Sequence, residues 1–168
     1  MTSQARGTAL LQPGRTAEAR SALRQARAGA ASVSAAQPGT GDDDILLRGM
    51  AQGAAESLAA QIALADGQPD QAVAAQVRAV ALSQKADATE PPLLGASARP
   101  ALADVQLRAG QAQAAEATFR ADLAAWPSSG WALRGLQRSL AAQGRPAEAQ
   151  AVAAALQRDW PGADPALR

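Results

Sequence analysis

The chain has 168 residues, with 16 Lys and Arg against 15 Asp and Glu, so its net charge is +1. That balance argues against a nucleic-acid or anionic-membrane partner, because both need a dense excess of basic charge. The chain has no Cys and no His, which excludes thiol chemistry, disulfides, Cys/His metal sites and Ser-His or Cys-His catalytic pairs. No apolar run approaches the roughly 20 residues of a membrane-spanning helix.

Alanine dominates the hydrophobic residues, and aromatic residues are limited to one Phe and three Trp. Alanine is the best helix former, since its side chain loses no rotamer freedom on folding. Bulky residues that favour strands are scarce. The composition therefore predicts an all-α fold of small-residue helices that pack closely.

The N-terminal part divides into two predicted segments. Residues 1–30 are expected to form a degenerate N-terminal repeat or helix, because Ala19, Leu23 and Ala26 follow helical spacing. This segment is rich in Arg, so a transit peptide is the alternative. Residues 31–43 are small and polar and are predicted to be a flexible linker. The absence of a secretory apolar core makes the cytoplasm the default location, unless the chain is a fragment of a longer protein.

Two helices are predicted next, at 45–66 and 69–84. Asp42, Asp43 and Asp44 are expected to cap the first of them and to match its dipole. They lack the spacing of a calcium loop, so no metal is expected. The following loop, 86–99, contains Pro91 and Pro92, which favour an extended chain. A loop lying across a binding groove and a plain tether both fit it.

The C-terminal half is predicted to contain helices at 100–110 and 112–126, a helix with an apolar stripe, and a helix at 146–159. Gly144 is expected to end the third helix, with Pro146 in the first turn of the fourth. The residues expected to face inward are Leu102, Val105, Ala115, Phe119, Leu123, Leu133, Leu136, Leu140, Ala149, Val152, Ala153 and Leu156. Trp160 and Pro161 are expected to close the last helix.

A period of 34 residues runs through this half of the chain. Four pairs share that offset: Gly110 with Gly144, Ala115 with Ala149, Trp126 with Trp160 and Pro127 with Pro161. A Gly followed five residues later by Ala also occurs at Gly67 and at Gly14. Each block predicts two helices joined by a turn at the glycine, and a period of this length indicates a helical repeat.

These blocks resemble tetratricopeptide repeats, which place Gly at the turn between helices, small residues at the helix contact and Pro at the end. The matching units are 53–86, 96–129 and 130–163, and the first of these lacks the terminal Pro. Residues 44–168 would then form the repeat array. The resemblance implies an α-solenoid of about three to four repeats, in which stacked antiparallel helix pairs form a right-handed superhelix.

A further resemblance covers about residues 50–165. The sequence Glu90-Pro91-Pro92, followed by Leu107 to Gly110, Ser129 to Leu133 and Ala142 to Arg145, is similar to the C-terminal part of longer bacterial repeat proteins. This chain departs from them because its loop 91–100 lacks their aromatic residues and most of their N-terminal array is missing.

The resemblance implies a concave groove lined by the first helix of each unit. Helical spacing and this resemblance together identify the residues expected to face the groove and bind a partner. These are Gln61, Leu64, Asp104, Arg108, Trp131, Arg134 and Arg138. Arg134 and Arg138 lie one turn apart, so both guanidinium groups can point at one carboxylate or phosphate. The competing interpretation is a solvated helix face on which Asp104 neutralises an arginine.

The other candidate features favour structural roles. Trp126 and Trp160 are expected to pack at equivalent helix ends, whereas Trp131 is the tryptophan expected to touch a ligand. Glu116 and Glu148 are expected to compensate helix-start charge.

Taken together, these patterns predict a scaffold that binds a peptide or helix of another protein, with no catalytic residue and no cofactor. The alternatives are a structural or self-assembly module and a regulatory fragment of a larger protein. Because only residues 162–168 follow the last helix, we expect its apolar surface to be covered by a partner or a second copy.

Overall fold

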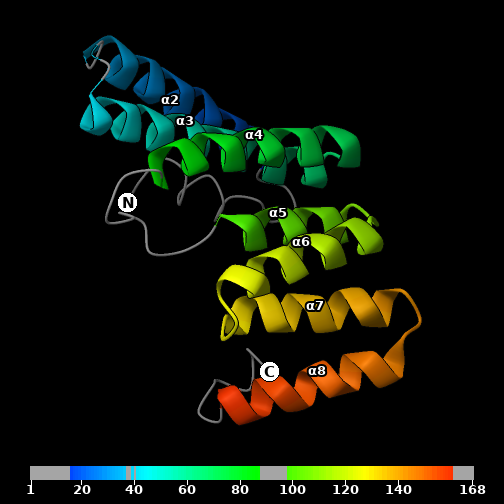
Figure 1. Cartoon of the computed structure of the whole chain (residues 1–168). Coiled ribbons are helices and arrows are strands. Elements are labelled where there is room, and N and C mark those ends of the chain that lie inside the picture. Colours follow the sequence, from blue (N-terminus) through cyan, green and yellow to red (C-terminus); the bar gives the residue numbers. More distant parts are fainter. Residues whose placement is uncertain (1–15, 37–38, 40, 88–97, 161–168) are drawn as a thin grey trace. The chain divides into compact units, whose positions relative to one another are not determined.

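The computed structural model describes residues 16–36, 39, 41–87 and 98–160. Within these ranges the chain forms seven helices and no strand (Figure 1). The predicted all-α class is therefore confirmed. The chain divides into two compact units, residues 1–98 and 99–168, and each is described by itself.

The first unit contains α2 (Thr16–Ala36), α3 (Asp42–Ala65) and α4 (Pro69–Asp87), and α3 packs against both of the others. Ala19 and Ala22 of α2 are buried with Leu58 and Ile62 of α3. Alanine on the α2 side allows the two backbones to approach closely, so the larger side chains of α3 fill the remaining space. The helices predicted at 45–66 and 69–84 are thus present with slightly different ends.

The linker predicted at 31–43 is wrong over most of its length. Residues 31–36 continue α2, and residues 42 and 43 already belong to α3. Ala31, Ala35 and Ala36 supply helix propensity, and Ser34 ties this end of α2 to α3, because its hydroxyl accepts a hydrogen bond of 3.1 Å from Nε2 of Gln52. Helix propensity together with packing on α3 therefore outweighs the small, polar character of the segment.

The capping role predicted for the three aspartates is also corrected. The N-cap of α3 is Gly41, and no side chain accepts a capping hydrogen bond there. The helix instead begins at Asp42, and Asp43 and Asp44 lie in its first turn, where carboxylates interact favourably with the helix dipole. The dipole part of the prediction is therefore compatible with their position, but the N-cap assignment is not.

The second unit contains α5 (Arg99–Arg108), α6 (Ala112–Ala125), α7 (Gly130–Ala142) and α8 (Pro146–Asp159). Each helix packs against the next, and α5 also contacts α7. The helix predicted at 146–159 has the observed bounds. Those predicted at 100–110 and 112–126 end one or two residues too late, because Ala109 and Gly110 form the turn and Trp126 is the C-cap of α6.

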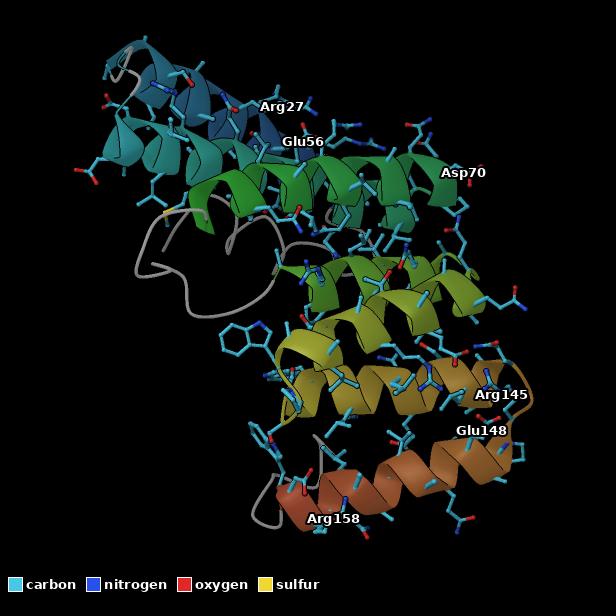
Figure 2. All side chains as sticks on the ribbon, viewed as in Figure 1. Arg27, Glu56, Asp70, Arg145, Glu148 and Arg158 are labelled. Atoms are coloured by element: carbon cyan, nitrogen blue, oxygen red, sulfur yellow. The ribbon has the colours of Figure 1, made fainter. Side chains whose placement is uncertain are left out.

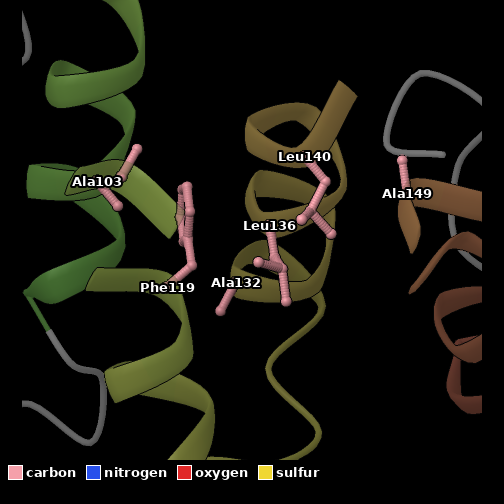
Figure 3. Packing of buried hydrophobic residues seen from close by; sticks show 7 residues of the cluster. Ala103, Phe119, Ala132, Leu136, Leu140 and Ala149 are labelled. Carbon is pink, nitrogen blue, oxygen red and sulfur yellow. The ribbon is translucent and has the colours of Figure 1, made fainter. Parts of the chain in front are cut away.

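The core of this unit combines small and large side chains (Figure 3). Phe119 of α6 and Leu136 and Leu140 of α7 are the large members of the core cluster, and its other members are alanines. The alanines of the cluster are Ala103, Ala115, Ala132 and Ala149. Most residues predicted to face inward are buried or pack on this cluster, whereas Leu102 is only half-buried.

The same turn joins three helix pairs in the two units. Its glycine has a positive φ in each case: +69° at Gly67, +80° at Gly110 and +71° at Gly144. At Gly144 the glycine N–H donates to Ala141 O, and the next N–H, of Arg145, donates to Leu140 O. The other two turns repeat both bonds at equivalent residues. This pattern is a Schellman motif, which favours glycine because other residues are strained at positive φ.

The two tryptophan corners also share one backbone geometry. Trp126 and Trp160 are the C-caps of α6 and α8, with φ of −132° and −134°. In both, the N–H donates to a carbonyl four residues earlier, that of Asp122 or Leu156. The 34-residue period is therefore present in the backbone of the second unit. Pro161 lies outside the described residues.

The final helix pair was predicted to leave apolar surface open, but α8 exposes mainly small and polar side chains. Val152 of α8 is half-buried and Leu156 is buried, and the exposed side chains of this helix are mainly Ala, Gln, Glu and Arg. The large exposed apolar group at this end is Trp160. Residues 161–168, which would follow α8, lie outside the described part of the chain.

Candidate functional site

A cavity of about 450 Å³ lies in the second unit between α5 and α7. Phe119 of α6 also contributes to its lining. The complete lining consists of Pro100, Ala101, Asp104, Phe119, Trp131, Arg134, Gly135 and Arg138. Four of the seven partner-binding residues predicted from the sequence therefore line one cavity.

The start of α7 determines which of its side chains reach the cavity. Ser129 is the N-cap, and its hydroxyl accepts a hydrogen bond from the N–H of Ala132. The helix begins at Gly130, so Trp131, Arg134 and Arg138 follow at intervals of three and four residues and share one face. A second stripe, Leu133, Leu136 and Leu140, is buried. The helix thus presents one face to the core and another to the cavity.

Gly135 allows α6 to approach α7 closely at the cavity. A Cβ atom added there would lie 2.0 Å from Cζ of Phe119, which is far inside van der Waals contact. The Phe119 ring therefore packs directly on the α7 backbone, and both residues line the cavity. Glycine is required here by close packing, since Gly135 is not among the glycines with positive φ.

The cavity carries positive charge that is partly neutralised. Its lining contains Arg134, Arg138 and Asp104. Helices α5 and α7 as a whole contain four Arg and one Asp, a net charge of +3. Asp104 is paired with Arg138 at 3.3 Å and with Arg108 at 3.8 Å. All three side chains are 40% or more exposed, so these pairs are screened by water and contribute little to stability.

This pairing changes the predicted role of the two arginines. The sequence suggested that Arg134 and Arg138 together face one ligand anion, with a neutralised face as the competing interpretation. Arg138 is paired with Asp104, as the competing interpretation expects, and both residues line the cavity. Arg134 lies on the cavity wall beside Trp131. A ligand carboxylate would have to compete with Asp104 for the Arg138 guanidinium.

The remaining predicted residues fall outside this lining. Arg108 borders it through its pair with Asp104. Gln61 and Leu64 lie on α3 of the first unit, where both are half-buried, and their role stays a prediction.

A second cavity, of about 510 Å³, lies in the first unit and was not foreseen. It is formed by α2, α3 and α4, and its walls combine four Ala and one Leu with Arg27, Gln52, Glu56 and Arg78. Glu56 of α3 lies 2.6 Å from Arg78 and 4.0 Å from Arg27, and Figure 2 shows Arg27 and Glu56 close together. The sequence signal was weak because three helices, distant in sequence, each supply a few small residues.

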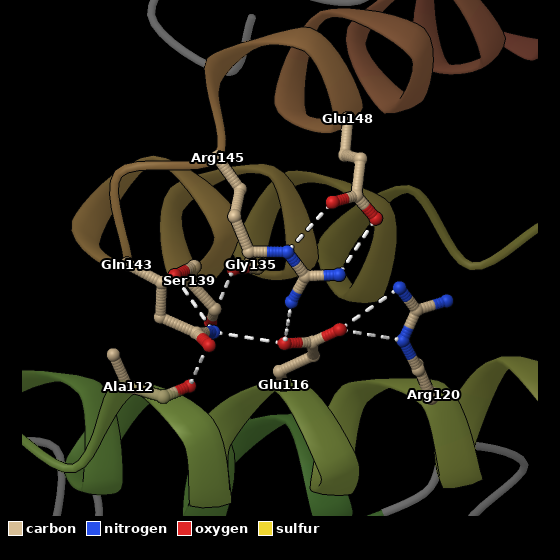
Figure 4. Close-up of polar contacts among 8 residues, drawn as sticks. All are labelled: Ala112, Glu116, Arg120, Gly135, Ser139, Gln143, Arg145 and Glu148. Carbon is tan, nitrogen blue, oxygen red and sulfur yellow. Dashed lines mark hydrogen bonds and ion pairs between the residues drawn. The ribbon is translucent and has the colours of Figure 1, made fainter.

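A polar network ties α6 to the turn between α7 and α8 (Figure 4). Glu116 accepts hydrogen bonds from Arg145 at 2.6 Å, Gln143 at 2.8 Å and Arg120 at 2.9 Å. Arg145 also binds both carboxylate oxygens of Glu148. The helix-start charge compensation predicted for the two glutamates fits Glu148, which lies in the first turn of α8, but not Glu116, because the first turn of α6 contains no acidic residue. Glu116 instead crosslinks two helix pairs.

The network shifts the proton affinity of its members. Hydrogen bonds from Gln143 and Arg120 lower the pKa of Glu116 below its ordinary 4.5, since they stabilise the charged form. Hydrogen bonds from Arg145 lower the pKa of Glu148, and Glu148 in turn raises the pKa of Arg145. The turn that precedes α8 is therefore held by charged, hydrogen-bonded groups near neutral pH.

Asp122 is the buried carboxylate of the second unit. It is 1% exposed, and its Oδ1 has no hydrogen-bond partner. It lies on the same face of α6 as Ala115 and Phe119. Leu156, the residue 34 positions later, is also buried, so an apolar side chain occupies the equivalent position of the next helix pair.

Two further properties concern the described residues as a whole. None of their helices is both long and apolar enough to cross a membrane. Across ranges 16–36, 41–87 and 98–160, no three acidic side chains are grouped so that they would hold a metal ion.

No family model matches the chain, and no curated protein and no solved structure shows a significant match. The function of the chain therefore has to be inferred from its residues and their geometry.

Proposed function

We propose that the chain is a tetratricopeptide-like scaffold and that the cavity between α5 and α7 binds an acidic segment, a peptide or a helix, of another protein. The repeat assignment is supported by the three equivalent glycine turns and by the matching C-caps at Trp126 and Trp160. In this proposal the helix pairs stack as a right-handed solenoid of about three to four repeats, and their first helices form the binding face.

The observation that carries the binding proposal is the distribution of charge in the second unit. Helices α5 and α7, which supply most of the cavity wall, have four Arg and one Asp, whereas α6 and α8 each have one Arg and two acidic residues. Positive charge is thus concentrated on the two helices that share the cavity. Arginine there can bind a carboxylate through two N–H groups, so an acidic polypeptide is the complementary partner.

The cavity lining favours binding over catalysis. It combines apolar side chains with Arg134, Arg138 and one carboxylate, Asp104, which is already ion-paired. Such a set orients and holds an anionic chain. We therefore propose a protein-binding role without enzymatic activity.

The proposal is tested with a short synthetic peptide in which two adjacent Asp residues are flanked by Gly and Ser and the end carries fluorescein. Fluorescence anisotropy measures its affinity for the wild type and for the double variant Arg134→Gln with Arg138→Gln. We expect the double variant to bind at least about tenfold more weakly, because two charge-assisted contacts are lost. The matched control is Arg158→Gln on α8, an exposed arginine outside the cavity.

Three outcomes would overturn the proposal. The first is equal affinity of the wild type and the double variant, and the second is an equal loss in the Arg158→Gln control. The third is no binding to the wild type at low salt.

A further inference from the structure

The tryptophans of this chain are unusually exposed. The chain has three Trp, one Phe and no Tyr, and Trp126, Trp131 and Trp160 are 48%, 64% and 42% exposed. Their indole rings therefore contribute little to the core, whose aromatic member is Phe119. Large indole surfaces left in water are typical of places that a partner covers.

Two of the three tryptophans flank one loop of the second unit in sequence, and the ring of the third folds onto it. Residues 127–129 link Trp126, at the end of α6, to Gly130 and Trp131, at the start of α7. Trp160 folds onto this loop. Its Nε1 donates a 2.9 Å hydrogen bond to Ser128 O, and its ring lies against Gly130, where an added Cβ would come within 2.9 Å of Cε2. We refer to Trp126, Trp131 and Trp160 as the tryptophan edge.

The tryptophan edge is continuous with the cavity, because Trp131 lines it together with Arg134 and Arg138. Arg134 and Arg138 follow Trp131 by three and seven residues, which corresponds to about 4.5 Å and about 10.5 Å along the helix at about 1.5 Å per residue. An extended peptide advances about 3.3 Å per residue. It therefore spans the distance from Trp131 to Arg134 in about one to two residues and the distance from Trp131 to Arg138 in about three residues.

We propose that the tryptophan edge binds a large apolar side chain of the same acidic segment, and that the segment carries acidic residues about one to two and about three positions away from that anchor. This inference rests on the proposed function and adds the order of residues that the partner must contain. The edge supplies apolar contact area, and the two arginines fix the register of the acidic residues. The Trp160 ring is held against the loop by its hydrogen bond to Ser128 O, so Trp131, which lines the cavity, is the main contact residue.

The test uses peptides in a Gly and Ser background. One contains the core Phe-Ser-Asp-Asp and a second contains the reversed core. A third replaces Phe by Ala, and a fourth has the same composition but places six Gly or Ser residues between Phe and the acidic pair. We expect one of the two contiguous orders to bind at least about tenfold more tightly than both the Ala peptide and the spaced peptide, since an aromatic anchor in a hydrophobic site is worth that much.

Substitutions then locate the anchor. Trp131→Ala is expected to remove the difference in affinity between the Phe peptide and the Ala peptide. Intrinsic fluorescence gives a second readout, because the chain has no Tyr and all three Trp lie in the second unit. The emission should shift to the blue on binding the Phe peptide, but not on binding the Ala peptide.

The possible failures separate the two proposals. Equal binding of the Phe, Ala and spaced peptides, all weakened by Arg134→Gln with Arg138→Gln, would overturn the anchor and leave the proposed function standing. No binding of any acidic peptide would overturn both. A blue shift with vesicles of anionic phosphatidylserine, and none with the peptides, would show that the edge contacts lipid and would also overturn the anchor.

Discussion

Gly135→Ala gives the most direct test of how the cavity is built. In most helix interiors, replacing Gly by Ala stabilises a protein by about 0.5–1 kcal/mol, because Ala loses less conformational entropy on folding. At position 135 the added Cβ would lie 2.0, 2.3 and 2.5 Å from three carbon atoms of the Phe119 ring. Either the ring or α7 must then move.

The steric cost should exceed the gain in helix propensity. Overpacking of a core typically costs about 1–3 kcal/mol. Phe119 is 2% exposed and belongs to the core cluster, so displacing its ring would disturb that packing. We expect Gly135→Ala to lower the free energy of unfolding of the second unit by about 1–2 kcal/mol, after the propensity gain is subtracted. The acidic peptide should also bind more weakly, because the ring lines the cavity.

Urea unfolding followed by tryptophan fluorescence measures this effect, since all the tryptophans lie in the second unit. Gly29→Ala in α2 is the matched control. An added Cβ there meets nothing within 4 Å, so this variant should stabilise the first unit, as followed by circular dichroism. Phe119→Leu combined with Gly135→Ala should recover part of the loss, because the smaller side chain leaves room. Stabilisation of the second unit by Gly135→Ala alone would refute the packing argument.

Three other predictions concern charged groups. Asp104→Asn should raise the affinity for the acidic peptide about two- to fivefold in anisotropy titrations, because the substitution removes the half-exposed carboxylate that competes with the peptide for Arg138. Unchanged or weaker binding would contradict this prediction. Asp122→Leu should raise the free energy of unfolding by about 1–3 kcal/mol in urea titrations, because a buried carboxylate oxygen lacks a partner, and Leu already occupies position 156; destabilisation would count against it. The lowered pKa of Glu116 implies stabilisation that is present above about pH 4.5 and is lost as the pH falls through the lower pKa of the folded state. Thermal unfolding between pH 6 and pH 3 should therefore depend less on pH in Glu116→Gln, and an unchanged slope would be the contrary result.

Local signals in the sequence predicted the helices and their turns well. Gly110 and Gly144 mark turns because their backbone conformation, at positive φ, strains other residues. Pro146 fixes the start of α8, and the predicted bounds of that helix are the observed ones. These features depend on the residue itself and its immediate neighbours, which is why the sequence was sufficient.

Features that depend on contacts distant in sequence were missed or only partly predicted. The pairing of Asp104 with Arg138 joins positions 34 apart, and helical spacing alone does not distinguish it from an anion site that both arginines share. The helical end of α2 depends on Ser34 meeting α3, which helical periodicity does not reveal. The burial of Asp122 was likewise hidden, because an Asp on a helix is normally solvated.

The candidate site could be predicted only in part. Helical spacing placed Trp131, Arg134 and Arg138 on one face of α7, and the structure brings that face to a cavity. Phe119 and Gly135 were not predicted as part of the lining, because their contact depends on the distance between two helices. The cavity in the first unit was missed for the same reason.

The central claim is that positive charge on α5 and α7 selects an acidic polypeptide. The most direct measurement is an anisotropy titration of the wild-type chain with the Asp-Asp peptide and with an otherwise identical Asn-Asn peptide, at low and at high salt. We expect the Asp-Asp peptide to bind at least about tenfold more tightly at low salt and to lose most of that advantage at high salt, because half-exposed charges are screened. Equal affinity for the two peptides at low salt would contradict the claim.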